Sequence, residues 1–278
     1  MPRFWLVLTA CLSVFATACQ PLANQPQQIL QRPSASTYSL PDQQLKTSIL
    51  NRHRSLTPRF WGENVPGVKR RLATKEKVIA LTLNACGGPK GDQYDAELMH
   101  FLRQQNVPAT LFINSRWIDA NYWTFMALSR NPLFEIENHG FSHKPLSVNG
   151  KQALGIQGTR NPGEAVDEVL KNHRKIQWNT GRQPRFFRSG TAYYDEVAVK
   201  IANDLGETVV NYNVLPDSGA TFTSEQVKNA LLSAKPGSIV LLHMNQPKKE
   251  TAEGVKKAIP ELKRRGFRFV KLQDYPLQ

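Results

Sequence analysis

The chain has 278 residues, of which 40% are hydrophobic and 21% are charged, so it is long and apolar enough to bury a sizeable core. Lysine and arginine number 36 against 22 acidic residues, which gives a formal net charge of +14 at pH 7. The basic residues are spread along the chain, and the densest runs (69–71 and 263–265) have no aromatic stacking pattern beside them. This distribution argues against nucleic-acid binding and favours attraction to an anionic surface; the alternative is an ordinary solvated, charged face.

Residues 1–19 predict an export signal. A short basic start precedes an apolar stretch, residues 4–18, that is too short to span a bilayer. Residues 16–19 resemble the lipobox of bacterial lipoproteins, which implies that Cys19 is lipidated and anchors the protein to a membrane. Gln20 favours the outer membrane in a Gram-negative host. The alternative is an ordinary secretory signal cut close to the same point, with a periplasmic or extracellular product.

Residues 20–72 predict a flexible tether and a lead-in. From residue 20 to about residue 57 the chain is rich in Gln, Pro, Ser and Asn, a composition that cannot bury enough apolar surface to fold alone. Because Cys11 and Cys19 fall in the signal, Cys86 is the single thiol of the remaining chain, and no disulfide is expected within it.

Residues 73–278 predict one domain in which strands and helices alternate. Seven apolar, β-branched segments predict strands at 78–83, 109–113, 133–136, 185–187, 208–212, 238–242 and 267–270. Helical patterns lie between them at 95–105, 116–129, 164–177, 195–204, 224–234 and 251–265. This alternation requires parallel strand pairing, which an open doubly wound sheet and a closed barrel would both satisfy.

Polar residues at the strand ends distinguish these two folds. They follow nearly every predicted strand, at Asn84, Cys86, Asn114, His139, Arg188, Asp217 and His243. In a β/α barrel the loops after the strands converge on the axis, whereas an open sheet gathers its polar groups mainly at one switch point. We therefore predict an α/β fold with a distorted TIM-like barrel of the (β/α)7 type.

Two histidines four residues apart, His139 and His143, follow the predicted strand at 133–136. Neutral imidazoles in such a turn suit zinc and similar divalent metals. The alternative is a pair of surface histidines. Their position at a strand end, in a chain with only 6 histidines, favours a divalent metal site with zinc as the leading candidate.

The segment around these histidines, residues 135–143, resembles the second motif of the polysaccharide deacetylases (carbohydrate esterase family 4). The family's third, fourth and fifth motifs resemble residues 186–190, 214–217 and 240–243, in the same order. Residues 85–88 are similar to the first motif of a bacterial subgroup, Asp-Ala-Cys-Gly-Gly. The resemblance covers roughly residues 77–272 and implies hydrolysis of N-acetyl groups on a polysaccharide.

The resemblance also implies a role for each matching residue. His139 and His143 would hold the metal, which polarises the acetamide carbonyl. His243 would protonate the leaving amine as general acid, with Asp217 orienting it.

Other matching residues would act around the reacting atoms. Arg188 pairs with the catalytic carboxylate in the family, and the backbone N–H of Thr191 would help to hold the oxyanion. Tyr193 is a candidate for the lining of a sugar groove. The first motif departs from the family's pattern, because Asn84 occupies the position of the catalytic aspartate and Ala85 that of a metal-binding aspartate. An amide cannot act as the base, and alanine cannot bind a metal.

Three interpretations of this departure are open. In the first, Asp92, Asp95 or Glu137 replaces the missing base, although Asp95 is favoured as a helix N-cap and Glu137 is an ordinary candidate to face solvent. In the second, Cys86 joins the histidines as a thiolate ligand; its alternative is a small buried residue in a glycine-flanked turn. In the third, hydrolysis has been lost and the cleft binds glycan.

The leading prediction is an exported, membrane-anchored, metal-dependent deacetylase of an N-acetylated envelope or extracellular polysaccharide. The substitutions at Asn84 and Ala85 would attenuate its activity. A catalytically inactive glycan-binding protein is the alternative, and a barrel hydrolase of a small amide is the third candidate. The predicted tether and the basic surface suit a polymer better than a small amide.

Overall fold

The computed structural model describes residues 1–2 and 40–278. Apart from Met1 and Pro2, the predicted signal (1–19) and the first part of the predicted tether (20–39) lie outside the described residues. No helix within the described part of the chain combines the length and apolarity needed to cross a bilayer.

Strands and helices alternate along the chain. The strands are β1 (Trp61–Gly62), β2 (Val78–Ala85), β3 (Ala109–Ile113), β4 (Phe134–Asn138), β5 (Phe186–Phe187), β6 (Tyr194–Asp195), β7 (Thr208–Val209), β8 (Ser238–His243) and β9 (Arg268–Val270). The helices are α1 (Leu40–His53), α2 (Ala96–Gln104), α3 (Ser115–Ala120), α4 (Tyr122–Ser129), α5 (Pro162–Thr180), α6 (Glu196–Asp204), α7 (Ser224–Leu232), α8 (Thr251–Arg264) and a 3-10 turn, η1 (Leu272–Asp274). The predicted alternation of strand and helix is confirmed.

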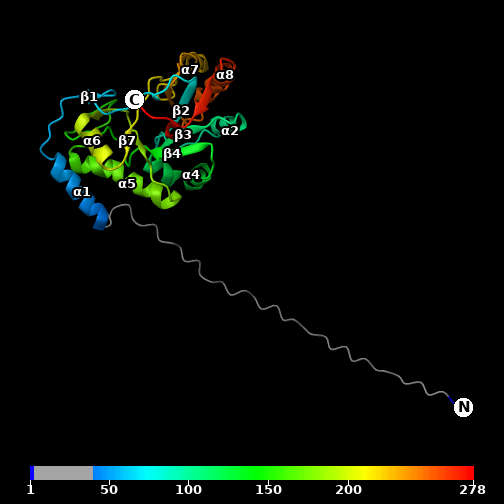
Figure 1. Ribbon diagram of the computed structural model, residues 1–278, viewed down its shortest axis with the longest axis horizontal. Helices are drawn as coiled ribbons and strands as arrows, with labels where there is room; N and C mark the ends of the chain where they lie inside the picture. The colour runs from blue at the N-terminus through cyan, green and yellow to red at the C-terminus, as the bar shows by residue number, and fades with distance from the viewer. Residues whose placement is uncertain (3–39) are drawn as a thin grey trace. The chain divides into compact units, whose positions relative to one another are not determined.

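The main sheet is parallel and curls into a distorted barrel. Its strand order is β7-β5-β4-β3-β2-β8, and β9 pairs with the first half of β2. The segment after β7 meets β8 through a parallel bridge between Val214 and Val240, which links the two ends of the curled sheet. Helices surround the strands, and α7 lies beside α8 (Figure 1). The predicted (β/α)7-type fold is therefore confirmed.

Alternation along β2 separates the inside of the barrel from the helix layer. Ile79, Leu81, Leu83 and Ala85 pack into the core that includes α2, α7 and α8. Val78 and Ala80 belong to a second core, together with residues of β8 and β9. Because successive side chains of a strand point to opposite faces, Thr82 and Asn84 point inwards.

The predicted helix at 116–129 is divided into α3 and α4 at Asn121. The backbone of Asn121 leaves the helical region, with φ of −128° and ψ of 39°. Its side chain donates hydrogen bonds to the carbonyls of Asp92 and Trp117. An asparagine that bonds local carbonyls in this way competes with a continuous helix.

The structure differs from the predicted tether between residues 40 and 72. Helix α1 forms there and packs on α5 and α6. Its Ile49 is 1% exposed, and Asp42 accepts a hydrogen bond of 2.7 Å from Arg174 of α5. The prediction of a flexible segment is wrong for this part. The composition cannot support a helix alone, and the stabilising partners lie more than a hundred residues away in sequence.

The lead-in after α1 is also ordered by distant partners. Strand β1 pairs antiparallel with β6. Lys69 forms a parallel bridge with Val210, and Arg71 forms an antiparallel bridge with Ser238 at the start of β8. The lead-in therefore joins the barrel through backbone hydrogen bonds that the sequence pattern does not reveal.

Candidate metal and catalytic site

The predicted site residues lie at the carboxyl ends of the strands. They come from four strand ends and one loop: Asn84 on β2 with Cys86 just after it, His139 after β4, Arg188 after β5, His243 at the end of β8 and Asp217 between β7 and α7. In this fold the strand ends converge, so residues far apart in sequence are brought to one face.

Three side chains lie close enough to share a metal ion. One ligand atom from each of Cys86, His139 and His143 lies within 4.8 Å of the others. Cys86 Sγ is 3.8 Å from His139 Nε2. Ligand atoms of a tetrahedral zinc site are about 3.5 Å apart, so a small contraction would suffice. His143 Nε2 is buried without a hydrogen-bond partner in the described region, as expected for an atom that binds a ligand.

His139 is held in the neutral form that a metal requires. It is fully buried, and its Nδ1 lies 2.8 Å from the carbonyl oxygen of Arg188. The proton therefore resides on Nδ1, and Nε2 turns its lone pair towards Cys86. Burial lowers the pKa of His139 to about 4, so the imidazole is uncharged at neutral pH.

Glu168 of α5 holds the loop that carries His143 in place. The buried Glu168 carboxylate accepts hydrogen bonds from the backbone N–H groups of Ser142 and Lys144, at 3.0 and 3.1 Å. His143 itself has φ of +62°, a left-handed conformation that is unfavourable for residues other than glycine. The carboxylate therefore helps to hold a strained loop that aims an imidazole at the site.

The loop after β5 lies directly against His143. A Cβ atom on Gly190 would lie 2.3 Å from the carbonyl oxygen of His143 and 2.6 Å from its Cγ. Only glycine fits there. The close approach of the two loops brings Thr191 to the same end of the barrel as the paired histidines.

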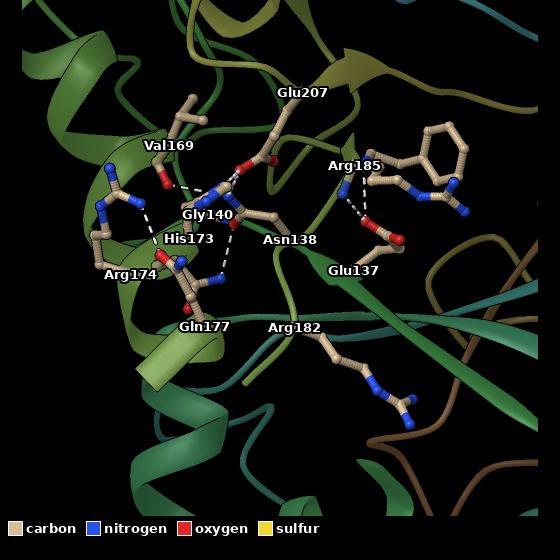
Figure 2. Close-up of polar contacts among 12 residues, drawn as sticks. Glu137, Asn138, Gly140, Val169, His173, Arg174, Gln177, Arg182, Arg185 and Glu207 are labelled. Atoms are coloured by element: carbon tan, nitrogen blue, oxygen red, sulfur yellow. Dashed lines mark hydrogen bonds and ion pairs between the residues drawn. The ribbon is translucent and has the colours of Figure 1, made fainter. Parts of the chain in front are cut away.

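A buried network of hydrogen bonds holds Asn138, the residue that precedes His139. The Asn138 side chain donates to Glu207 and to the carbonyl of Val169, both at 2.9 Å, and accepts from the N–H of Gly140 (Figure 2). Glu207 also binds His173 Nδ1 at 2.6 Å. Asn138 therefore connects the end of β4 to α5 and fixes the start of the loop that carries His139 and His143.

His243 forms an ion pair with the fully buried Asp217. Its Nδ1 lies 3.0 Å from Asp217 Oδ1, and its backbone N–H donates to Oδ2 at 2.7 Å. Thr251 donates to the same carboxylate. Burial tends to lower the pKa of His243, but the charge of Asp217 outweighs it and raises that pKa to about 10. His243 is therefore cationic at neutral pH and can donate a proton.

Cys86 lies among imidazoles. Burial raises the pKa of its thiol, but the charge of His143 and the contacts with His139 and His243 outweigh this effect, and the pKa lies well below the ordinary value. A thiolate is the form of cysteine that binds metals and acts as a nucleophile.

Asn84 faces a buried cation. Arg188 Nη1 donates to Asn84 Oδ1 at 3.1 Å and to the Thr82 hydroxyl at 2.8 Å. The other donors of this guanidinium bind the carbonyls of Val210 and Asn211. Burial lowers the pKa of Arg188 to about 10. A carboxylate at residue 84 would neutralise this charge, whereas the amide leaves it unbalanced.

The neighbouring position does not reach the site. Ala85 packs into the helix-facing core, on the opposite face of β2 from Asn84. Cys86, one residue later, approaches His139. The family resemblance places Ala85 at the position of a metal-binding aspartate; in the structure, Ala85 points away from the histidines and the adjacent Cys86 is the residue whose side chain approaches them.

The three alternative carboxylates lie outside the site. The Glu137 carboxylate accepts from the N–H groups of Arg185 and Phe186 at 2.8 and 2.7 Å and is buried, so the prediction that it faces solvent is wrong. Asp95 caps α2 through the N–H of Leu98, as predicted. Asp92 is exposed, and it does not line the groove beside Cys86.

Thr191 and Tyr193 follow Arg188 in the loop after β5. The Thr191 hydroxyl is buried and has no hydrogen-bond partner in the described part of the protein. The Tyr193 ring packs against Trp61 at 6.0 Å between ring centroids and is half-buried. Their predicted roles in oxyanion and sugar binding stay predictions.

A groove of about 510 Å³ opens beside Cys86 and His243. This volume falls within the usual range for sites that bind small ligands. Its lining comes from the loop after β2, from α3, from Gly219 in the loop before α7, and from the end of β8 with the segment that follows; it contains no aspartate or glutamate of the described residues.

Sequence reasoning missed the residues that support the site. Glu168 carries no sequence signal of its own, and Gly190 belongs to the segment that resembles the third motif but has no evident role there, since each acts through a contact with the distant His143 loop. Thr251, the first residue of α8, resembles an ordinary helix start, yet its hydroxyl binds Asp217. Only the three-dimensional arrangement identifies them.

Comparison with known proteins reveals a clear set of similarities. The sequence profile of polysaccharide deacetylase matches residues 71–210. A peptidoglycan-N-acetylglucosamine deacetylase of Bacillus cereus is 26% identical over 207 residues, which are 73% of this chain and 90% of that protein. A peptidoglycan-N-acetylmuramic acid deacetylase of Bacillus subtilis is 27% identical over 209 residues, 72% of each protein.

Solved structures share the same fold. A family 4 acetyl xylan esterase from Clostridium thermocellum, in complex with a cobalt ion, has a TM-score of 0.57 and 26% identity and covers 71% of this chain and 89% of that chain. A family 4 pseudoenzyme from Bacillus anthracis has a TM-score of 0.62 and 22% identity and covers 80% of this chain and 70% of that chain. The second likeness concerns the fold alone.

Proposed function

The chain belongs to the polysaccharide deacetylase family, and from this premise we propose that it is an exported, metal-dependent hydrolase that removes N-acetyl groups from an envelope or extracellular polysaccharide. The observation that carries the proposal is the convergence of Cys86, His139 and His143 with the nearby His243–Asp217 pair. The Bacillus relatives are described as peptidoglycan deacetylases, which supports an N-acetylated glycan as the substrate.

A divalent metal fits the donor set of the site. Cys86, His139 and His143 would hold it, and three protein ligands leave a position open for water or substrate. When bound, such an ion polarises the acetamide carbonyl and lowers the pKa of a water molecule, so that this water can lose a proton and attack the carbonyl carbon. A thiolate with two imidazoles favours zinc among the common divalent metals. The likeness to an esterase solved with a cobalt ion supports a divalent cation.

The chain's own residues would handle the leaving group. His243 is cationic at neutral pH and would transfer a proton to the amine nitrogen as the carbon–nitrogen bond breaks. Asp217 fixes its orientation by binding both its backbone N–H and its ring nitrogen. The backbone N–H of Thr191 would stabilise the developing oxyanion, and Tyr193 would line the sugar groove.

Catalysis would be attenuated at the step that removes a proton from water. Asn84 cannot accept that proton, and no carboxylate of the described residues lines the groove. Losing a general base commonly lowers the rate by about a hundred- to ten-thousand-fold. We therefore expect slow deacetylation that depends on the metal.

The second candidate function is glycan binding without hydrolysis. The Asn84–Arg188 contact favours it, because a neutral amide occupies the place where a base would be needed. In the same fold, the Bacillus anthracis pseudoenzyme has a mutant described as having restored enzymatic activity, so loss of hydrolysis and its recovery are both known for that protein.

Metal analysis and an amine-release assay on the purified full chain would separate the two functions. We expect one bound zinc per chain, slow release of amine from N-acetylated chito-oligosaccharides, and loss of both in His139→Ala. His100→Ala, which changes an exposed histidine of α2, is the matched control and should keep both properties. Amine release that persists in His139→Ala would contradict the proposed metal dependence. Bound metal and bound glycan without amine release would support the binding function instead.

Export and anchoring rest on residues 1–19 and are tested separately. Mass spectrometry of the mature amino terminus, from cells that process the precursor, should find a lipid-modified Cys19. A free terminus cut near the same residue would support an ordinary secretory signal. Neither result affects the proposal for the metal site.

A further inference from the structure

The groove beside the candidate site carries positive charge on one wall. Lys90, from the loop after β2, and Arg116, from α3, line it together with Cys86 and His243. Both cationic side chains belong to exposed residues. No acidic residue of the described chain faces them across the groove, so nothing in the lining neutralises them.

Neither Lys90 nor Arg116 forms an ion pair with another residue that the structure describes. By contrast, two lysines of α8 form ion pairs, Lys257 with Glu225 at 2.8 Å and Lys256 with Glu253 at 3.1 Å. The Arg116 guanidinium donates from Nε to Asn114 Oδ1 at 3.3 Å and from Nη2 to the carbonyl of Cys86 at 3.5 Å. Such contacts orient a guanidinium and leave its charge available to a ligand.

The glycines after Cys86 shape this wall. A Cβ on Gly87 would lie 2.6 Å from the backbone nitrogen of Trp117, so only glycine lets the loop approach the start of α3. A Cβ on Gly88 would lie 3.2 Å from Arg116 Nη1, which places the guanidinium directly over the loop. The turn that delivers Cys86 to the histidines therefore also places Arg116 at the mouth of the groove.

We propose that the groove recognises a carboxylate-bearing N-acetylated glycan, with Arg116 and Lys90 as the residues that determine this specificity. The inference rests on the proposed function, because the acetamide would lie against His243 and Cys86 while a carboxylate on the same or an adjoining sugar meets the cationic wall. Arg116 offers planar paired donors that match a carboxylate, and Lys90 offers a mobile point charge. A neutral oligosaccharide would gain nothing from either.

Calorimetric binding of two matched glycans tests this specificity without relying on turnover. The probes are peptide-free peptidoglycan glycan strands, whose alternate sugars carry a carboxylate, and the same strands after methyl esterification. We expect the free acid to bind the full-length protein about tenfold more tightly at low salt. Raising the salt concentration should remove most of this preference, because exposed charges are screened.

Substitutions of the two cations test whether the preference for the free acid arises in the groove. Arg116→Gln should reduce the preference for the free acid to about twofold or less, and Lys90→Gln should reduce it in part. Lys235→Gln, which changes an exposed lysine just before β8 at the opposite end of the barrel, is the matched control and should leave the preference unchanged.

The outcomes separate this inference from the proposed function. Equal binding of the acid and its ester, with amine release from neutral oligosaccharides intact, would overturn the specificity and leave the deacetylase proposal standing. A preference that survives Arg116→Gln and Lys90→Gln together would also overturn it. Failure to bind either strand and to release amine from any N-acetylated oligosaccharide would refute both proposals.

Discussion

Replacing Asn84 by aspartate would place a carboxylate opposite the buried guanidinium of Arg188. In the wild-type protein this cation is fully buried, and its only side-chain hydrogen-bond partners in the described chain are Asn84 and Thr82, both neutral. Burial lowers the pKa of Arg188 from 12.5 to about 10. That difference corresponds to about 3 kcal/mol of unfavourable free energy for keeping the charged form buried at neutral pH.

The distance between residue 84 and Arg188 sets the size of the expected gain in the free energy of unfolding. Arg188 Nη1 and Asn84 Oδ1 are 3.1 Å apart. Opposite charges at about this separation attract by roughly 5 kcal/mol at an effective dielectric constant of about 20. Desolvation of the new carboxylate removes several kcal/mol of that attraction. We therefore expect Asn84→Asp to raise the free energy of unfolding by about 1–2 kcal/mol at pH 7.

The gain should depend on pH in a definite direction. A carboxylate beside a guanidinium has a lower pKa in the folded state than in the unfolded state. Its contribution to stability is present in full above the unfolded value of about 3.9 and is lost as pH falls through the folded value. Urea unfolding of the metal-free variant and wild type at neutral and acid pH measures this difference.

The matched control makes the same change, asparagine to aspartate, beside a carboxylate instead of beside a guanidinium. Asn138 is also a buried asparagine at a strand end, but its amide donates to the carboxylate of Glu207. Asn138→Asp should therefore destabilise the protein by several kcal/mol. Lower stability of Asn84→Asp at pH 7, or a gain that is equal at both pH values, would show that no ion pair with Arg188 forms.

The same substitution tests catalysis. The carboxylate returns at the position of the missing base, and His243, the proposed general acid, is already paired with Asp217. Amine release should rise by about a hundredfold or more in the zinc-loaded protein. No increase, with metal and glycan bound, would favour the inactive glycan-binding function.

Three further changes probe the supporting structure. Glu168→Gln should weaken zinc binding about tenfold in calorimetry, because it removes the charge that holds the metal-binding loop. Gly190→Ala should abolish zinc binding and lower the melting temperature, since its Cβ would collide with the carbonyl of His143. In chelator, His243→Gln should lower the free energy of urea unfolding below about pH 6.5, and this difference should vanish towards about pH 10, where the raised pKa of His243 releases its proton.

Much of the barrel and of its active face could be predicted from the sequence. Parallel pairing follows from the alternation of strands and helices, and the polar residues after the strands indicate one end of a barrel. His139 and His143 satisfy a spacing rule that concerns only neighbouring residues. Their approach to Cys86, within 4.8 Å, depends on how β2 and β4 are placed around the ring.

The end of β2 shows a limit of predicting strand boundaries from the sequence pattern. The sequence predicts that this strand stops at Leu83, whereas it extends to Ala85. Strand alternation over those two residues directs Asn84 into the barrel and Ala85 into the helix layer, and the turn that follows brings Cys86 to His139. A strand boundary moved by two residues thus decides which side chain faces the candidate metal site.

Helix α1 fails to be predicted for a different reason. Its residues are mostly polar, and its attachment depends on Ile49 and on ion pairs with helices α5 and α6. Composition measures what a segment can bury by itself. It contains no information on partners that the fold brings from more than a hundred residues away.

Metal binding and proton abstraction are separable in this site because different residues would supply them. The family pattern places a base and a metal ligand on adjacent aspartates; here the thiolate of Cys86 stands near the histidines, while Asn84 leaves Arg188 without a counter-charge. A thiolate is a strong zinc ligand, so affinity for the ion would be retained. Loss of the base raises the free energy of the transition state for hydrolysis and leaves the free energy of metal binding unchanged. The proposed function therefore implies a chain that holds zinc tightly and hydrolyses slowly, and the rate gained by Asn84→Asp would measure the contribution of the missing base.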